Sequence, residues 1–299
     1  MIRSNRNDIA LMEMKTIGIL YPGDMGAAIA EILLKNKFRV VTAGAGRSLK
    51  TLNHINRANI EDLQSLEKVI DESDILLSVN SPNKSIEIAE EAARYMGSSQ
   101  KHRIFVDLNS NTPEAAVKIE QLFSLKNTSF INGAVLGSSK DMEKDSVMVL
   151  SGRHRELMIT MLDGMFNIKD AGGQTASASA YKLLFSLVNK GINAVFFETM
   201  AAASHYGILD ELNSSLEQYL PGTYLDLMKT TPTYTDHTER RMHEMKGLAE
   251  MQRASGLPDY ISSAAAETFA MVNHSGIFKN AAPSTVLETF QLFKKLNRK

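Results

Sequence analysis

Short apolar runs alternate with amphipathic segments through the first half of the chain, and no other feature constrains the fold as strongly. The apolar runs are TIGIL, FRVVTAG, DILLSV, RIFVDL and FINGAVLG, and helices are predicted between them at residues 25–36, 84–96 and 113–122. Strands buried on both faces form continuous apolar runs, and helices between such strands make right-handed crossovers. The pattern predicts an α/β domain with a doubly wound parallel sheet over residues 15–170.

The second half has helical periodicity instead of short apolar runs. One helical pattern covers residues 177–209, and others follow at about 212–219, 236–254, 258–273 and 283–296. We expect residues 171–299 to form an all-helical domain for substrate binding and dimerisation, and residues 1–14 to form a flexible leader. The first helix is too long for a small domain to cover alone, so its remaining face is expected to line an interdomain cleft or the core of a homodimer.

Composition excludes several classes of function. The 299 residues carry a formal net charge of -1, so no overall positive field is expected to attract nucleic acid. The chain has no cysteine, which rules out disulfides and thiolate chemistry, and no apolar segment is long enough to span a membrane. The amino terminus lacks the apolar core of a signal peptide. These features predict a cytoplasmic protein that acts on a small molecule.

A glycine-containing turn follows the first predicted strand and precedes an alanine-rich helix. Pyrophosphate is bound by backbone N–H groups at a helix N-terminus, where glycines let the backbone come close. The Rossmann fingerprint is incomplete, because Tyr21 stands at the position of its first glycine and only Gly23 and Gly26 follow. The strand-turn-helix context still favours a dinucleotide site over a tight turn without a ligand. The residues expected to bind the cofactor here are Tyr21, Pro22, Gly23, Asp24, Met25 and Gly26.

The end of the second predicted strand indicates which dinucleotide binds. An NAD site usually has a carboxylate there for the ribose 2'-hydroxyl, but residues 42–48 contain none. They contain Arg47 and Ser48, and a guanidinium beside a hydroxyl suits a 2'-phosphate. We therefore predict NADP(H) in preference to NAD, with a solvated loop arginine as the alternative interpretation of Arg47.

These motifs resemble those of the 3-hydroxyacid dehydrogenase superfamily. The resemblance rests on the turn YPGDMG, the Gly-Arg-Ser after the second strand, VDLNS at 106–110, NGAVLG at 132–137 and a lysine early in a long helix. The superfamily includes 3-hydroxyisobutyrate dehydrogenase, 6-phosphogluconate dehydrogenase and the imine reductases. The second half is similar to a branch that joins a 6-phosphogluconate dehydrogenase-like NAD(P)-binding domain to its own helical C-terminal domain. The resemblance implies a Rossmann-type fold and hydride transfer with a nicotinamide cofactor.

Lys182 is the candidate acid or base. A lysine can exchange the proton of a hydroxyacid if desolvation lowers its pKa, and Lys182 lies among apolar residues of the long helix. Helical spacing predicts one polar stripe that contains Lys182, Ser186, Asn189 and Asn193. This stripe either lines the active site, with Ser186 and Asn189 as substrate contacts, or forms a hydrated seam of the helical bundle. The resemblance implies that Lys182 is the family's catalytic lysine, and an ion-paired or snorkelling lysine is the alternative. The family has an asparagine or a His-Asn pair shortly after it, where this chain has Phe185 and Ser186, so Asn189 is a candidate substitute.

The loop after the last apolar run of the first half is a candidate site for the substrate's carboxylate. The family usually has V-S-G-G there, whereas this chain has Leu136 at the serine and Ser138 at the second glycine. We expect Gly137, Ser138 and backbone N–H groups to hold the carboxylate of a small organic acid. Asn80 and Asn109 follow two other strands, and each is expected to touch the nicotinamide ribose or the substrate unless it only caps a loop.

A cationic helical segment begins near residue 236. Within it, Arg241 is a candidate contact for a phosphate or carboxylate of the substrate, and a solvated, salt-bridged helix face is the alternative. The histidines form no ligand motif, so no metal site is predicted.

The sequence thus predicts an NADP(H)-dependent oxidoreductase of the 3-hydroxyacid dehydrogenase type. Its substrate is expected to be a small hydroxyacid or ketoacid, with Lys182 as the acid or base. Two alternatives stay open: an imine reductase on the same scaffold, and a catalytically inactive NADP-binding protein. The departures from the family pattern that raise them are at Tyr21, Leu136, Phe185 and Ser186.

Overall fold

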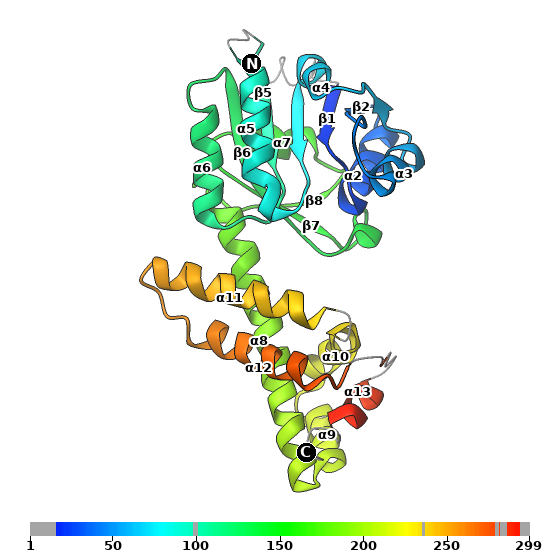
Figure 1. Ribbon diagram of the computed structural model, residues 1–299, viewed down its shortest axis with the longest axis vertical. Coiled ribbons are helices and arrows are strands. Elements are labelled where there is room, and N and C mark those ends of the chain that lie inside the picture. Colours follow the sequence, from blue (N-terminus) through cyan, green and yellow to red (C-terminus); the bar gives the residue numbers. More distant parts are fainter. Residues whose placement is uncertain (1–15, 98–100, 235–236, 279–280, 282–285, 294–299) are drawn as a thin grey trace, which may run out of the picture. The chain divides into compact units, whose positions relative to one another are not determined.

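The computed structural model describes residues 16–97, 101–234, 237–278, 281 and 286–293 of the chain (Figure 1). The chain divides into two compact units, Met1–Leu183 and Leu184–Lys299. The division falls inside the long helix α8 (Ser177–Tyr206), whereas the sequence pattern predicts it before that helix, after residue 170. The predicted leader lies outside the described residues.

The first unit is built on one eight-stranded sheet in the order β3-β2-β1-β4-β5-β6-β7-β8. The strands are β1 (Thr16–Leu20), β2 (Arg39–Thr42), β3 (Glu61–Asp62), β4 (Ile75–Ser78), β5 (Arg103–Asp107), β6 (Thr128–Leu136), β7 (Val147–Ser151) and β8 (Asn167–Asp170). The strands from β1 to β6 run parallel in the Rossmann order. In contrast, β7 is antiparallel to β6, and β8 is parallel to β7. The predicted fold class is confirmed, with the reversed β7 as an addition.

Helices cover both faces of this sheet (Figure 1). They are α2 (Asp24–Lys35), α3 (Leu49–Arg57), α4 (Leu66–Glu72), α5 (Ser85–Met96), α6 (Pro113–Phe123) and α7 (Arg155–Met161). Successive strand residues point to opposite faces. Accordingly, Ile19 belongs to an apolar cluster with α2, α3 and α7, whereas Leu20 belongs to a second cluster with α4, α5 and α6. Because both faces are buried, a ligand site must form where the strands end.

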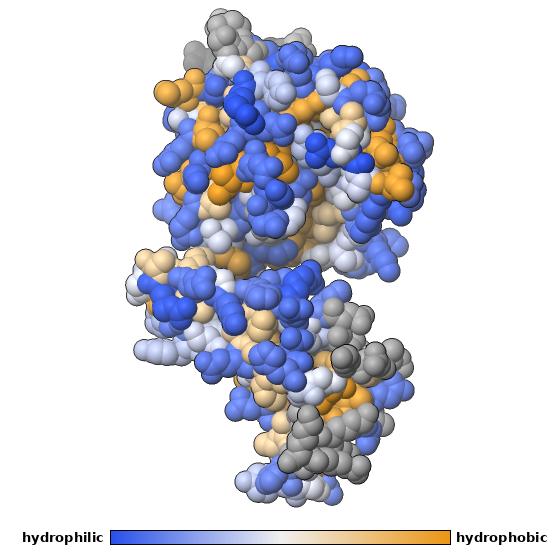
Figure 2. Space-filling model, viewed as in Figure 1, coloured by the Kyte–Doolittle hydropathy of each residue, from blue (hydrophilic) through white to orange (hydrophobic). Residues whose placement is uncertain are grey.

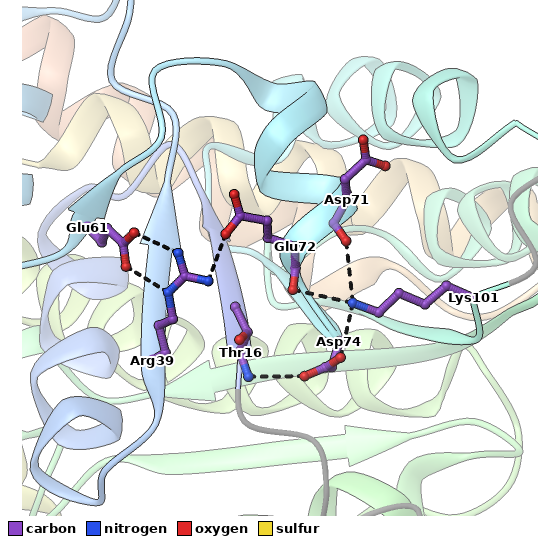
Figure 3. Close-up of polar contacts among 7 residues, drawn as sticks. All are labelled: Thr16, Arg39, Glu61, Asp71, Glu72, Asp74 and Lys101. Carbon is purple, nitrogen blue, oxygen red and sulfur yellow. Dashed lines mark hydrogen bonds and ion pairs between the residues drawn. The ribbon is translucent and has the colours of Figure 1, made fainter.

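Ion pairs tie the amino-terminal ends of the strands together (Figure 3). The guanidinium of Arg39, at the start of β2, donates to both carboxylate oxygens of Glu61 (2.7 and 2.6 Å) and lies 2.7 Å from the carboxylate of Glu72. The ammonium of Lys101 lies 3.1 Å from the carboxylate of Asp74. Partly exposed pairs of this kind add little stability individually. They occupy the edge of the sheet opposite to the carboxyl ends of the parallel strands.

The second unit consists of helices in its described part. After α8 follow α9 (Leu209–Tyr219), α10 (Pro221–Thr230), α11 (Thr238–Ala254), α12 (Tyr260–Ser275) and α13 (Val286–Phe293). Its core contains Phe197, whose ring lies 5.2 Å from that of Tyr234 and 6.2 Å from that of Phe269. The sequence analysis missed α10, because Pro221 and Gly222 suggest a break. Proline is in fact favoured in the first turn of a helix, where Pro221 stands.

The surface of the first unit is mainly hydrophilic on the visible face, with several separate apolar patches (Figure 2). Among the helices that the structure describes, none combines the length and the apolar composition needed to cross a membrane.

Candidate cofactor site

The turn between β1 and α2 lies where the strand order of the sheet reverses. β1 pairs with β2 on one side and with β4 on the other, and ligands of doubly wound sheets bind at such a switch point. The N-cap residue of α2 is Gly23, which has no side chain to satisfy the first N–H groups of the helix. These N–H groups suit an anionic ligand.

The two glycines of the turn are required for different reasons. A Cβ on Gly23 would meet no described atom within 4 Å, so this position faces open space. A Cβ on Gly26 would lie 3.1 Å from Cβ of Pro22 and 3.4 Å from Cγ2 of Ile19. Gly23 therefore lets a ligand approach the backbone, and Gly26 lets α2 pack against β1. These are the roles of the later two glycines in the dinucleotide fingerprint.

Tyr21 stands at the position of the missing first glycine and adopts a backbone conformation that glycine favours. Its φ is +54°, in the left-handed region. The Cζ atom of Arg47 lies 3.8 Å from the centroid of the Tyr21 ring, and the phenol donates a hydrogen bond to Glu91 of α5 at 3.3 Å. Burial and the nearby Glu91 carboxylate raise the pKa of Tyr21 to about 12, so the phenol is neutral at pH 7.

A groove of about 640 Å³ opens beside Tyr21. This volume lies within the range of small-molecule and cofactor sites. The groove is lined by Tyr21 at the end of β1, the start of α3 and the segment from β4 into α5, whereas residues 22–26 of the turn are not among its lining residues. The lining residues are Tyr21, Gly46, Arg47, Ser48, Thr51, Asn80, Ser81, Lys84, Glu87, Ile88, Glu91 and Arg94. Four predicted cofactor contacts, at positions 21, 47, 48 and 80, are thus brought together.

Ser48 has a second role as the N-cap of α3. Its hydroxyl oxygen accepts a hydrogen bond from the backbone N of Thr51 at 3.2 Å. The Arg47 side chain is exposed beside it. A phosphate at this place would meet a guanidinium, a hydroxyl and the N-terminus of a helix, and each of these favours an anion.

The other residues of the turn support it in different ways. The carboxylate of Asp24 lies 3.4 Å from Nζ of Lys50 and 3.5 Å from Nε2 of His54, both on α3. Lys50 therefore weakens the repulsion between Asp24 and an anion bound at the start of α2. Pro22 is buried, and Met25 packs against the apolar core, so these two side chains hold the turn in place.

Asn109 belongs to a buried network and does not line the groove. Its Nδ2 donates to Oγ of Ser78 at 2.8 Å and also to the carboxylate of Asp107, while its Oδ1 accepts a hydrogen bond from the backbone N of Asn80. Asn111 donates to the other oxygen of Asp107 at 2.5 Å. The structure thus places Asn109 where it holds the loop that carries Asn80. Its contact with a cofactor stays a prediction.

Asp107 is the buried acid of this network, at the end of β5. Burial raises its pKa to about 6, and hydrogen bonds from Asn111 and Asn109 offset only part of that effect. A carboxyl that titrates near neutral pH is more common at functional sites than in ordinary cores.

Lys182 lies at the carboxyl end of β6. Asn132 of β6 and Ser151 of β7 both hydrogen-bond to the segment where α8 begins, Ser151 by accepting from the backbone N of Ala178 at 2.9 Å. One turn further along α8, the ammonium of Lys182 donates to the backbone carbonyl of Val135. Two polar side chains and one carbonyl therefore fix the position of this half-buried lysine.

The predicted carboxylate loop follows Val135 directly. Gly137 has a φ of +112°, and a Cβ on it would lie 2.5 Å from Oγ of Ser146, so only glycine fits there. The hydroxyl of Ser138 donates a hydrogen bond to the carboxylate of Asp141 at 2.6 Å, so its proton is already used in a contact within the loop. The structure brings this loop and the lysine to the same end of β6, and carboxylate binding by Ser138 stays a prediction.

The remaining predicted substrate contacts lie in the second unit. Ser186 and Asn189 are on α8, and Asn189 lines a cavity of about 190 Å³ together with residues of α10. On α11, Arg241 stacks on the ring of Tyr234, 3.5 Å from its centroid, and donates to Thr233 at 2.9 Å. Substrate binding by these residues stays a prediction.

Sequence analysis missed four functional candidates: Glu91, Asp107, Asn132 and Ser151. Glu91 acts on a residue 70 positions earlier, which no local pattern reveals. Asp107 and Asn132 lie within the VDLNS and NGAVLG motifs, where a polar residue ending or interrupting an apolar run is a readable signal.

Two family models match the chain. The model described as the NAD binding domain of 6-phosphogluconate dehydrogenase matches residues 16–166, and a domain of unknown function, DUF1932, matches residues 203–272. Among curated proteins, the "Uncharacterized 28.5 kDa protein in 7S RNA 5'region" of Methanothermus fervidus is 26% identical over 230 residues. That alignment covers 77% of this chain and 87% of the relative.

Solved structures of two oxidoreductases are similar over nearly the whole chain. The 3-hydroxyisobutyrate dehydrogenase of Mycobacterium tuberculosis with L-serine has a TM-score of 0.74 at 16% identity, covering 95% of this chain and 99% of that one. The reductive aminase of Aspergillus terreus in complex with NADPH and ethyl levulinate has a TM-score of 0.56 at 16% identity, covering 93% and 98%. At these identities the two structures establish a shared fold.

Proposed function

Because the chain belongs to the family that carries the NAD binding domain of 6-phosphogluconate dehydrogenase, we propose that it is an NADP(H)-dependent oxidoreductase of the 3-hydroxyacid dehydrogenase type. The observation that carries the proposal is the groove beside Tyr21, in which Arg47 and Ser48 stand together at the start of α3. A 2'-phosphate has the charge and the acceptors to use both groups, whereas a 2'-hydroxyl would leave the guanidinium without an anionic ligand.

The turn residues fit the rest of a dinucleotide. Gly23 faces open space and α2 begins immediately after it, so a pyrophosphate can approach the backbone N–H groups without a steric clash. Asn80 lies further along the same groove, after β4. We assign it to the ribose or the substrate.

The chemistry we propose places proton transfer on Lys182. When bound, the nicotinamide cofactor would donate or accept the hydride. The ammonium of Lys182, held by the Val135 carbonyl, would give a proton to the oxygen of a ketoacid or, as the amine, take it from a hydroxyacid. Gly137 and the backbone N–H groups after β6 would hold the carboxylate. Since one strand end carries both functions, a small organic acid is the proposed class of substrate.

The test combines binding with turnover. NADPH and NADH are titrated by the fluorescence of the bound nicotinamide, and the protein is assayed with a panel of small hydroxyacids, ketoacids and cyclic imines. We expect NADPH to bind about tenfold or more tightly than NADH, and an acid to be turned over by the wild type but not by Lys182→Ala. Equal affinities for the two cofactors would contradict the assignment of NADP(H).

Two other outcomes would replace the proposed reaction. Imine turnover that persists in Lys182→Ala would establish an imine reductase, since hydride transfer to C=N does not need this lysine. Tight NADPH binding without turnover across the panel would establish an inactive NADP-binding protein. The apolar Phe185, where the family has a polar residue, is the feature that makes these outcomes worth testing.

We also propose that the chain forms a homodimer through α8. Phe185, Val188, Ile192 and Val195 recur at intervals of three and four residues, and their side chains are 52, 63, 41 and 64% exposed. This spacing is that of a helix-packing seam. A second copy would cover the stripe by a symmetric contact between the two α8 helices, because both carry the same self-complementary surface.

A further inference from the structure

The conformation of Tyr21 is costly for a residue with a side chain. A φ of +54° brings Cβ close to the backbone, and glycine would avoid this strain entirely. Strained backbone persists where the surrounding structure over-determines it, and it often marks a functional position. The Tyr21 side chain is therefore expected to make contacts that glycine could not make.

The two ends of the Tyr21 side chain have different partners in the groove. The Arg47 guanidinium stacks on the Tyr21 ring, with Cζ 3.8 Å from the ring centroid. The Tyr21 hydroxyl donates a hydrogen bond to the carboxylate of Glu91 on α5 at 3.3 Å. The hydrogen bond fixes the ring from the α5 side. The ring in turn restricts a long, exposed arginine that would otherwise occupy many rotamers.

Three cations line the groove: Arg47, Lys84 and Arg94. Lys84 is neutralised by Glu87 at 2.7 Å on the same helical segment. In the part of the chain that the structure describes, neither Arg47 nor Arg94 has a carboxylate within ion-pair distance. Arg47 stands next to Ser48 at the start of α3, and its guanidinium stacks on the neutral Tyr21 ring. A stacked guanidinium keeps its N–H groups at its edge, where they can donate to an anion in the groove.

We propose that Tyr21 is a positioning residue that holds Arg47 for the 2'-phosphate of NADP(H), and that it thereby sets the preference for the phosphorylated cofactor. The inference rests on the proposed function. In this chain a tyrosine replaces the first glycine of the fingerprint. The cost of its strained backbone is offset because Arg47 is already oriented to bind the phosphate.

The test isolates the 2'-phosphate with two small probes, 2',5'-ADP and 5'-AMP. Calorimetry gives the dissociation constant of each probe for the full-length wild type, Tyr21→Leu, Tyr21→Phe, Tyr21→Gly, Arg47→Ala and the double variant Tyr21→Leu/Arg47→Ala. The selectivity is the ratio of the dissociation constant of 5'-AMP to that of 2',5'-ADP. Tyr219→Leu is the matched control, because this exposed tyrosine lies on α9 and does not line the groove.

We expect the selectivity for 2',5'-ADP to be retained in variants with an aromatic ring at position 21 and lowered in variants without one. Tyr21→Leu lowers it about three- to tenfold, the range of a cation–π contact, while Tyr21→Phe and Tyr219→Leu stay within about twofold of the wild type. Tyr21→Leu has no further effect in the Arg47→Ala background. Tyr21→Gly relieves the backbone strain and still loses selectivity, which a merely structural role of Tyr21 would not produce.

The variants distinguish a failed role of Tyr21 from a wrong cofactor. If Arg47→Ala abolishes the selectivity but Tyr21→Leu and Tyr21→Gly retain it, the positioning role is overturned and the NADP(H) site stands. If the wild type binds both probes equally or binds neither, the proposed cofactor is wrong and the role of Tyr21 is overturned with it. Should Tyr21→Leu fail to fold, Tyr21→Gly decides the outcome alone.

Discussion

The ammonium of Lys182 on α8 donates a hydrogen bond to the backbone carbonyl of Val135 near the end of β6. This contact brings a proton donor to the edge of the sheet where a ligand binds in folds of this kind.

Replacement of Lys182 should therefore affect chemistry more than cofactor binding. In Lys182→Met we expect turnover of the acid substrate to fall about 100-fold or more, the range of a lost general acid or base. The dissociation constant of NADPH should change by less than about threefold. Lys229→Met, on the exposed side of α10, is the control and should behave like the wild type. Equal losses of turnover in both variants would remove Lys182 from the mechanism.

Gly23 should be required for the ligand and not for the fold. Its backbone is extended and a Cβ would meet no described atom within 4 Å, so Gly23→Ala should melt within about 2 °C of the wild type. The added methyl would occupy the space in front of α2, and we expect NADPH to bind about tenfold more weakly. Thermal melting and a fluorescence titration measure the two effects.

Gly222→Ala is the matched control for Gly23→Ala, since a Cβ there also meets no described atom within 4 Å. It should leave both the melting temperature and the affinity unchanged. Unaltered NADPH binding in Gly23→Ala would show that the turn does not approach a pyrophosphate.

Asp107 should make stability depend on pH in an unusual direction. Its pKa is about 6 in the folded protein, against an ordinary value of 3.8, so the folded state binds this proton more tightly than the unfolded chain does. The stabilising contribution of the protonated Asp107 to the free energy of unfolding is largest below about pH 4 and is lost as pH rises through about 6. The free energy of unfolding of the wild type should therefore fall relative to Asp107→Asn by about 2 kcal/mol between pH 4 and pH 7.

Denaturant unfolding of both proteins at several pH values measures that difference. Asp163→Asn, at an exposed aspartate, should show no such trend relative to the wild type. A difference between wild type and Asp107→Asn that is flat across this range would mean that Asp107 titrates normally.

A charge on the exposed stripe of α8 should prevent dimerisation. Val188 is 63% exposed in the middle of this stripe, and burying an aspartate there against a second copy would leave an unpaired charge. Light scattering after size-exclusion chromatography should give a dimer for the wild type and a monomer for Val188→Asp. Leu125→Asp, at a residue that is 98% exposed in the first unit, should stay dimeric. A wild type that is monomeric at micromolar concentration would contradict the proposed dimer.

The elements of the fold that can be predicted from the sequence are those whose hydrophobic pattern lies within one short segment. The alternation of apolar runs and amphipathic helices reveals the sheet and the positions of α2, α5 and α6 to within one or two residues. It misses β3, which has two residues, and it misses β7 and β8, together with the antiparallel direction of β7. An apolar run such as VMVLS has the same pattern in either direction, and only the tertiary connection decides it.

The candidate site can be read from the sequence where one segment carries it and not where distant segments meet. Gly23, Gly26 and Arg47 are candidates because of their place in a strand-turn-helix segment and after the second strand. The left-handed conformation of Tyr21 cannot be read in this way, because it is supported by a ring contact with Arg47 and a hydrogen bond to α5. Asn109 shows the converse limit: its position after a strand suggests a ligand contact, whereas its amide hydrogen bonds to Ser78 and Asp107 depend on tertiary packing that no local pattern reveals.

The order of the strands also determines when this site can exist during folding. β1 pairs with β4, whose residues 75–78 follow β1 by more than fifty positions, and the groove needs Tyr21 from one side of that pairing and Asn80 from the other. Contacts so far apart in sequence form late and slowly. A nascent chain that ends before β4 would have no groove, and NADPH would slow hydrogen exchange only after β1 and β4 have joined.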